Sequence, residues 1–87
     1  MAKSKKQISF LITHYNRPDD LAKCLAAIRN LNILDSEIVV CDDASEKRHL
    51  EKIKGFQMDH LIVAEVNRGL AANINKGIAL CQGKYIV

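Results

Sequence analysis

The sequence predicts an α/β fold in which four strands alternate with three helices, in the order β-α-β-α-β-α-β. Short, nearly continuous apolar runs recur along the chain, and such runs are typical of strands covered on both faces of a parallel sheet. Between them lie stretches whose apolar residues repeat at helical spacing. Polar turns follow the runs. We therefore expect a doubly wound, mostly parallel sheet with helices packed on it.

The first strand and helix are expected in the first third of the chain. Residues 8–13 are nearly continuous in apolar and β-favouring side chains. Pro18 suits the first turn of a helix, and the carboxylates of Asp19 and Asp20 favour its positive end. Apolar residues then recur three and four positions apart, at Leu21, Cys24, Leu25, Ile28 and Leu31. This stripe should face the sheet.

The second strand is expected over residues 37–41, and two adjacent carboxylates, Asp42 and Asp43, follow it. A short helix should then run from Ser45 or Glu46 to Lys54, with Leu50 and Ile53 facing inward and Gly55 closing it.

The third strand is expected over residues 60–64, and the last helix should begin near Asn67-Arg68-Gly69 and end at Gly83 in the C′ position. Residues 84–87 begin a fourth strand, and the chain stops within it. We interpret this ending as a cut through a larger domain, with residues 1–7 as a polar leader and residues 8–87 as the folded part.

The composition limits the class of protein. With 87 residues the chain is at most one domain, and 48% hydrophobic with 26% charged residues is ordinary for a globular protein. The net charge of +3 is carried largely by Lys3, Lys5 and Lys6 of the leader, so no nucleic-acid partner is expected. The three cysteines form no C-x-x-C pair and should be buried, which indicates a reducing, cytoplasmic setting. No histidine or cysteine spacing predicts a metal site.

The carboxyl ends of the first two strands hold the residues that predict a function. Ligands of open α/β sheets bind at this edge, where Thr13 and Tyr15 would face Asp42 and Asp43. A carboxylate can accept a hydrogen bond from N3-H of uracil or thymine, or from N1-H and the amino group of guanine, whereas it repels the N3 acceptor of cytosine. Tyr15 offers a flat face for a base. These residues describe a nucleoside pocket.

Structural interpretations of the same residues stay open. Asp42 and Asp43 could merely precede a helix that Ser45 caps, and Tyr15 could fill the end of the sheet. His14 should turn aside, and Asn16 is expected to cap the first helix.

Other fold families fit less well. A dinucleotide-binding domain needs a glycine-rich first turn, and residues 14–18 contain no glycine. A receiver-like domain carries its paired acids after the first strand, which here ends in Thr13. It remains a minor alternative, beside a non-enzymatic α/β binding module.

Four segments in order resemble the family 2 glycosyltransferases of the GT-A fold. They are Ser9-Phe10-Leu11-Ile12-Thr13-His14-Tyr15-Asn16-Arg17, Ile38-Val39-Val40-Cys41-Asp42-Asp43-Ala44-Ser45, the stretch from Asn67 to Ala79, and Gly83-Lys84-Tyr85-Ile86. The resemblance implies that residues 8–87 form the N-terminal, nucleotide-sugar-binding part of a Rossmann-like GT-A domain, truncated at the fourth strand. It also implies an enzyme that moves a sugar from a nucleoside diphosphate, most often UDP, to a saccharide or lipid-linked acceptor.

The same resemblance assigns roles to residues. Thr13 and Tyr15 match positions that hold the base, Asp43 matches the acid that contacts uracil, and Asp42 matches its supporting neighbour. The family's Asp-x-Asp turn, which binds Mn²⁺ or Mg²⁺, is expected just beyond Val87, and the general base later still. No catalytic or metal-binding residue is therefore expected within this chain, which should be inactive alone.

One position departs from the family pattern. Many relatives have Ala-Arg-Asn in the last helix where this chain has Asn73-Ile74-Asn75, so the usual arginine is Ile74. We expect Arg68 to supply a cation near the diphosphate instead.

Two expectations concern the surroundings of the protein. Its full-length form should be cytoplasmic or lie at the inner face of the membrane. The abrupt end of the chain predicts self-association through an exposed sheet edge or apolar patch.

Overall fold

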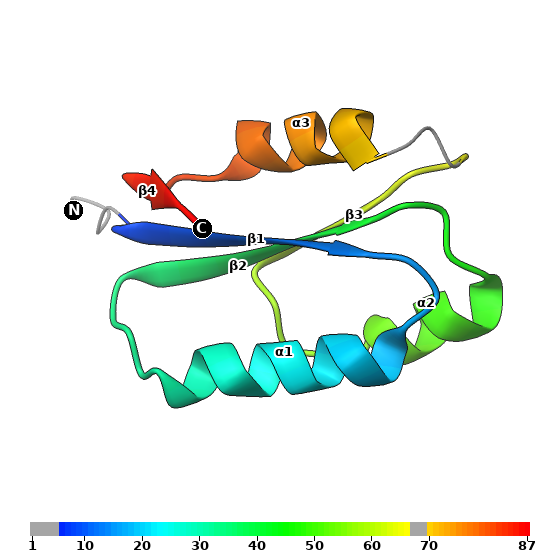
Figure 1. Ribbon diagram of the computed structural model, residues 1–87, viewed down its shortest axis with the longest axis horizontal. Coiled ribbons are helices and arrows are strands. Elements are labelled where there is room, and N and C mark those ends of the chain that lie inside the picture. Colours follow the sequence, from blue (N-terminus) through cyan, green and yellow to red (C-terminus); the bar gives the residue numbers. More distant parts are fainter. Residues whose placement is uncertain (1–5, 67–69) are drawn as a thin grey trace.

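The computed structural model describes residues 6–66 and 70–87 and has the expected alternation of strands and helices. The elements are β1 (Ile8–His14), α1 (Pro18–Asn30), β2 (Ser36–Asp42), α2 (Lys47–Ile53), β3 (His60–Val63), α3 (Leu70–Leu80) and β4 (Tyr85–Ile86). The four strands form one sheet in the order β3-β2-β1-β4, and every pair is parallel. Helices α1 and α2 cover one face and α3 covers the other (Figure 1). The α/β prediction is confirmed.

Strand β2 lies at the centre of the structure because both of its faces are covered. Six of its seven residues, from Glu37 to Asp42, are buried. Ile38 and Val40 join the core on the side of α1 and α2, which consists of Phe10, Leu21, Leu25, Ile38, Val40 and Ile53. Val39 and Cys41 are equally buried and alternate with these residues, as strand geometry requires. Double coverage explains why this strand is an unbroken apolar run.

The stripe expected on α1 is only partly correct. Leu21 and Leu25 are buried and Ile28 is half-buried, but Cys24 and Leu31 are exposed. The prediction that all three cysteines are buried is therefore correct for Cys41 and wrong for Cys24, while Cys81 is half-buried. In α2, Ile53 is buried and Leu50 packs against the core, as expected.

Gly83 serves a purpose other than the one expected. Helix α3 already ends at Leu80, so Gly83 is not its C′ residue. Its backbone N-H instead donates to Ser9 Oγ at 2.7 Å. A Cβ atom at this position would lie 2.5 Å from the backbone nitrogen of Ser9. Glycine is needed because the α3–β4 turn passes directly over β1.

Gly83→Ala should therefore lower the free energy of unfolding by about 2 kcal/mol, since the added methyl group overpacks the turn against β1. Gly55→Ala is the matched control. A Cβ there meets only the Lys52 carbonyl oxygen, at an ordinary 3.6 Å. Urea denaturation of both variants would check the prediction. Equal stability for the two would show that the contact with Ser9 does not require glycine.

The last strand leaves apolar surface exposed. It pairs only with Ile8 and Ser9, and Tyr85, Ile86 and Val87 are 60%, 45% and 68% exposed.

Among the described helices, none is both long enough and apolar enough to cross a membrane.

Candidate functional site

The carboxyl ends of β1 and β2 bring two turns together. His14 is the register partner of Asp42, so the β1–α1 turn (residues 15–17) and the β2–α2 turn (residues 43–46) begin side by side. The backbone N-H of Asp43 donates to the His14 carbonyl oxygen at 3.0 Å, which extends the pairing by one residue. The juxtaposition expected from the sequence is present.

A buried network of hydrogen bonds joins these turns. His14 and Asp42 are 5% and 0% exposed, and His14 Nδ1 lies 2.7 Å from Asp42 Oδ1. The same Asp42 oxygen accepts a hydrogen bond from Ser45 Oγ at 2.6 Å, and Asp42 Oδ2 accepts one from the Ser45 backbone N-H at 2.8 Å. The Asp42 carboxylate is thus enclosed and saturated by donors.

The helix cap expected at Asn16 is wrong, and the alternative in which Ser45 caps the following helix does not hold either. The N-cap of α1 is Arg17 and that of α2 is Glu46, not Asn16 and Ser45. Asn16 Oδ1 instead accepts a hydrogen bond from the Glu46 backbone N-H at 2.8 Å, and the Asn16 N-H donates to Ser45 Oγ at 2.9 Å. Both polar residues link one turn to the other.

Each turn contains a residue in the left-handed region of backbone conformation. Asn16 has φ 52°, which suits asparagine, whereas Ala44 has φ 62°, which costs an alanine roughly 1 kcal/mol. A strained residue directly after the two acids indicates that the surrounding hydrogen bonds determine the shape of this turn.

Asp43 differs from Asp42 in having a buried oxygen without a partner. Its side chain is half-buried, and among the described residues Oδ1 is the one buried side-chain oxygen or nitrogen that makes no hydrogen bond. Such atoms are uncommon, because an unsatisfied buried acceptor costs about 1–3 kcal/mol. The oxygen can accept a hydrogen bond from a donor group of a ligand that enters beside it.

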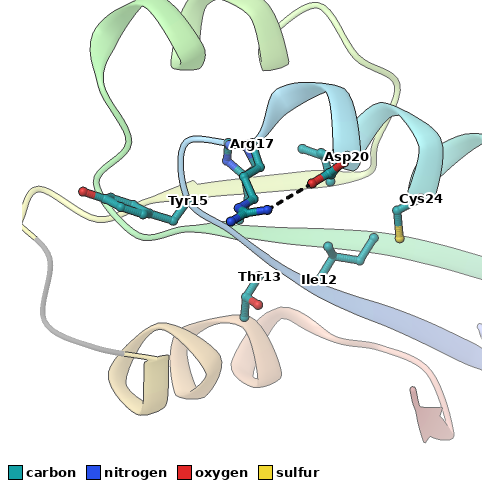
Figure 2. Close-up of a pocket in the computed structure, with 8 residues that line it drawn as sticks. Ile12, Thr13, Tyr15, Arg17, Asp20 and Cys24 are labelled. Atoms are coloured by element: carbon teal, nitrogen blue, oxygen red, sulfur yellow. Dashed lines mark hydrogen bonds and ion pairs between the residues drawn. The ribbon is translucent and has the colours of Figure 1, made fainter.

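Thr13 and Tyr15 line a cavity of about 240 Å³ between the end of β1 and the start of α1 (Figure 2). Tyr15 is 50% exposed and extends past the ends of the strands, while Thr13 points towards α3. Arg17 lies over the cavity, with its guanidinium 3.5 Å from Asp20. Asp43 does not line this cavity. The backbones of Thr13 and Tyr15 thus border the same cavity, but the Thr13 side chain points to the other face of the sheet, and Asp43 is linked to this strand end through its backbone contact with His14.

The cation expected near the diphosphate cannot be placed, because Arg68 falls outside the described residues. Ile74, at the position of the family's arginine, is half-buried in α3. In the described parts of the chain, no group of three or more His, Cys, Asp or Glu residues could hold a metal ion.

The role of His14 was not predicted from the sequence. We expected its side chain to turn aside, whereas it forms a hydrogen bond with Asp42. The sequence did indicate that the last residues of two adjacent parallel strands lie near one another. It did not indicate that His14 and Asp42 are register partners, because the register of the two strands could not be predicted.

Comparison with known proteins identifies the family. Residues 9–87 match the model of the family described as glycosyl transferase family 2. The chain is 31% identical over 83 residues to a poly-beta-1,6-N-acetyl-D-glucosamine synthase of Staphylococcus epidermidis, covering 92% of this chain and 20% of that protein. It is 28% identical over 82 residues to a chondroitin synthase of Escherichia coli, covering 91% and 12%.

A cholesterol galactosyltransferase of Borreliella burgdorferi is 27% identical over 86 residues, which are 95% of this chain and 24% of that protein. The chain thus spans a quarter or less of the length of these relatives. Because the family model covers nearly the whole chain, the chain belongs to glycosyl transferase family 2.

Proposed function

We propose that the chain is the nucleotide-binding part of a glycosyltransferase that uses a nucleoside-diphosphate sugar, with a UDP-sugar as donor. One observation carries this proposal: the buried, unpaired oxygen of Asp43 stands at the carboxyl edge of a parallel sheet, on a residue whose backbone N-H donates to His14, between Thr13 and Tyr15 in the chain. In open α/β sheets this edge is the usual place for a nucleotide.

The chemistry of Asp43 favours uracil over cytosine. A carboxylate oxygen only accepts hydrogen bonds at neutral pH, so it pairs with the N3-H of uracil and repels the N3 lone pair of cytosine. Burial strengthens this discrimination, because a mismatched base would leave the acceptor desolvated and unpaired. Tyr15, half exposed at the end of β1, offers its ring to the face of the base.

In this proposal Asp42 does not touch the base and instead supports the turn that holds Asp43. Its carboxylate is fully buried and already receives hydrogen bonds from His14 and Ser45. We assign it the supporting role, Thr13 and Tyr15 the base pocket, and Arg68 the neighbourhood of the diphosphate.

The whole enzyme would add what this chain does not supply. We propose a saccharide or lipid-linked acceptor, a Mn²⁺ or Mg²⁺ ion bound outside residues 1–87, and a cytoplasmic site at the inner face of the membrane. The relatives named for transfer of galactose or synthesis of N-acetylglucosamine polymers are compatible with a sugar nucleotide as donor. The chain alone should bind nucleotide without transferring sugar.

A non-enzymatic binding module is the competing function, and titration separates the two. UDP, dTDP, GDP and CMP should be titrated into the chain by calorimetry. The proposal expects CMP to bind most weakly, and Asp43→Ala to abolish the preference. Indistinguishable binding of all four nucleotides would contradict it.

A further inference from the structure

Tyr15 stands between two residues that are anchored to the neighbouring turn. On one side, His14 contacts Asp42 at 2.7 Å, and on the other, the backbone N-H of Asn16 donates to Ser45 at 2.9 Å. The position of the Tyr15 backbone is therefore determined by hydrogen bonds that its own side chain does not make. The phenol ring remains free to meet a ligand, with half of its surface exposed.

Asp43 is fixed through the same histidine. Its backbone N-H donates to the carbonyl oxygen of His14, and the preceding Asp42 binds the imidazole of His14. His14 thus touches the backbone of one candidate ligand-binding residue and is the sequence neighbour of the other. A shift of this one residue would move Asp43 and Tyr15 relative to each other.

The partners of the imidazole indicate which tautomer it adopts. Nε2 lies 3.0 Å from the backbone nitrogen of Arg17, whose N-H can only donate, so Nε2 is the acceptor. The ring proton then resides on Nδ1 and is donated to Asp42 Oδ1. Both nitrogens are used, and the side chain is almost completely buried. His14 therefore reaches a bound base only through its neighbours.

We propose that His14 is a positioning residue of the nucleotide site, which holds Tyr15 and Asp43 at the separation that a uracil base requires. This rests on the proposed function. Small displacements of binding groups are costly, because hydrogen bonds weaken steeply once their geometry is lost. The bond from Nδ1 to Asp42 links the two turns, whereas the bond from Arg17 to Nε2 stays within one turn.

Two variants separate these bonds. In His14→Asn the side-chain amide nitrogen occupies the place of Nδ1, so the bond to Asp42 is kept and the bond from Arg17 is lost. In His14→Gln the amide reaches the place of Nε2, so the link between the turns is lost. We expect His14→Asn to bind UDP within about threefold of the wild type, and His14→Gln to bind it at least about tenfold more weakly and with less preference over CMP.

Ser9→Ala is the control for a purely structural effect. It removes a buried hydrogen bond to Glu37 at the opposite end of the sheet, so it should destabilise the fold without touching either turn. Stability is measured by urea denaturation, and UDP and CMP affinities by calorimetry at a temperature where every variant is folded. Ser9→Ala should keep the affinity and the preference of the wild type.

The outcomes distinguish the two proposals. If the wild type itself shows no preference for UDP, the proposed function fails. If the wild type prefers UDP but both His14 variants bind it like the wild type, the positioning role fails alone. It fails equally if affinity in the His14 variants and in Ser9→Ala falls only in step with stability.

Discussion

Replacing Glu37 by alanine should lower the free energy of unfolding by about 3–5 kcal/mol, the largest loss of stability that we expect for a single substitution in this chain. Glu37 is 2% exposed, accepts a hydrogen bond from Ser9 Oγ at 2.6 Å and accepts another from the backbone N-H of Gln82. Through these hydrogen bonds Glu37, in β2, connects β1 and the turn after α3. Alanine would leave these buried donors unsatisfied and a cavity beside them.

Such a loss is a large share of the total for a domain of this size, which is roughly 4–13 kcal/mol. Glu51→Ala is the matched control, because Glu51 is exposed on α2 and should change stability by less than about 0.5 kcal/mol. Denaturant unfolding of both variants measures the difference. A change below about 1 kcal/mol for Glu37→Ala would contradict the role of the network.

The same carboxylate should make stability depend on acid pH. Burial by itself would raise the pKa of Glu37, but hydrogen bonds from Ser9 and the Gln82 backbone, with His60 nearby, outweigh burial and lower it. A lowered pKa means that the stabilisation is present above the unfolded value, about 4.3, and is lost as the pH falls through the folded value. Glu37→Gln should therefore lose less stability than the wild type between about pH 5 and pH 2.

Asp43→Asn should abolish the preference for UDP over CMP, a change that we expect to be about 10- to 100-fold in the ratio of dissociation constants. The asparagine amide can present either an oxygen to N3-H of uracil or an NH₂ group to N3 of cytosine, so it discriminates poorly. Calorimetric titration of both nucleotides measures the ratio. A preference retained in full would exclude Asp43 as the residue that reads the base.

Stability should separate Asp43 from its neighbour. Among the described residues the Asp43 side chain makes no hydrogen bond through its buried oxygen, so Asp43→Asn should leave the fold as stable as before. Asp42→Asn replaces a fully buried carboxylate that accepts hydrogen bonds from His14 and Ser45, and it should be clearly destabilising. On the proposed function, Asp43 would then be the residue of the pair that binds the base, and Asp42 the one that stabilises the fold.

Local patterns were sufficient to predict the order of elements. Apolar runs and helical spacing placed all seven, and Pro18 marked the start of α1 correctly. Contacts between distant segments were harder to foresee. Asn16 and Ser45 look like helix caps in the sequence, but each bonds to the opposite turn, because the parallel register of β1 and β2 brings the two turns within reach.

The burial of Glu37 also depends on contacts between distant segments. A glutamate at the start of an apolar run looks like the polar end of a strand. Its carboxylate is nevertheless buried, because Ser9 and Gln82 donate hydrogen bonds to it from 28 and 45 residues away. Gly83 was predicted as a helix terminator for the same reason, since its contact with β1 is invisible in the local sequence. The meeting of the two turns, in contrast, was predictable because the carboxyl ends of parallel strands lie at one edge of the sheet.

The proposed hydrogen bond between Asp43 and the base can be tested directly by nuclear magnetic resonance with UDP labelled with ¹⁵N at N3 of uracil. If Asp43 accepts from N3-H, the imino proton of the bound nucleotide should be protected from exchange with water and show a cross-relaxation signal to the Asp43 methylene protons, and both effects should disappear in Asp43→Ala. An imino proton that exchanges as fast in bound UDP as in free UDP would contradict the assignment of this edge of the sheet to the uracil base.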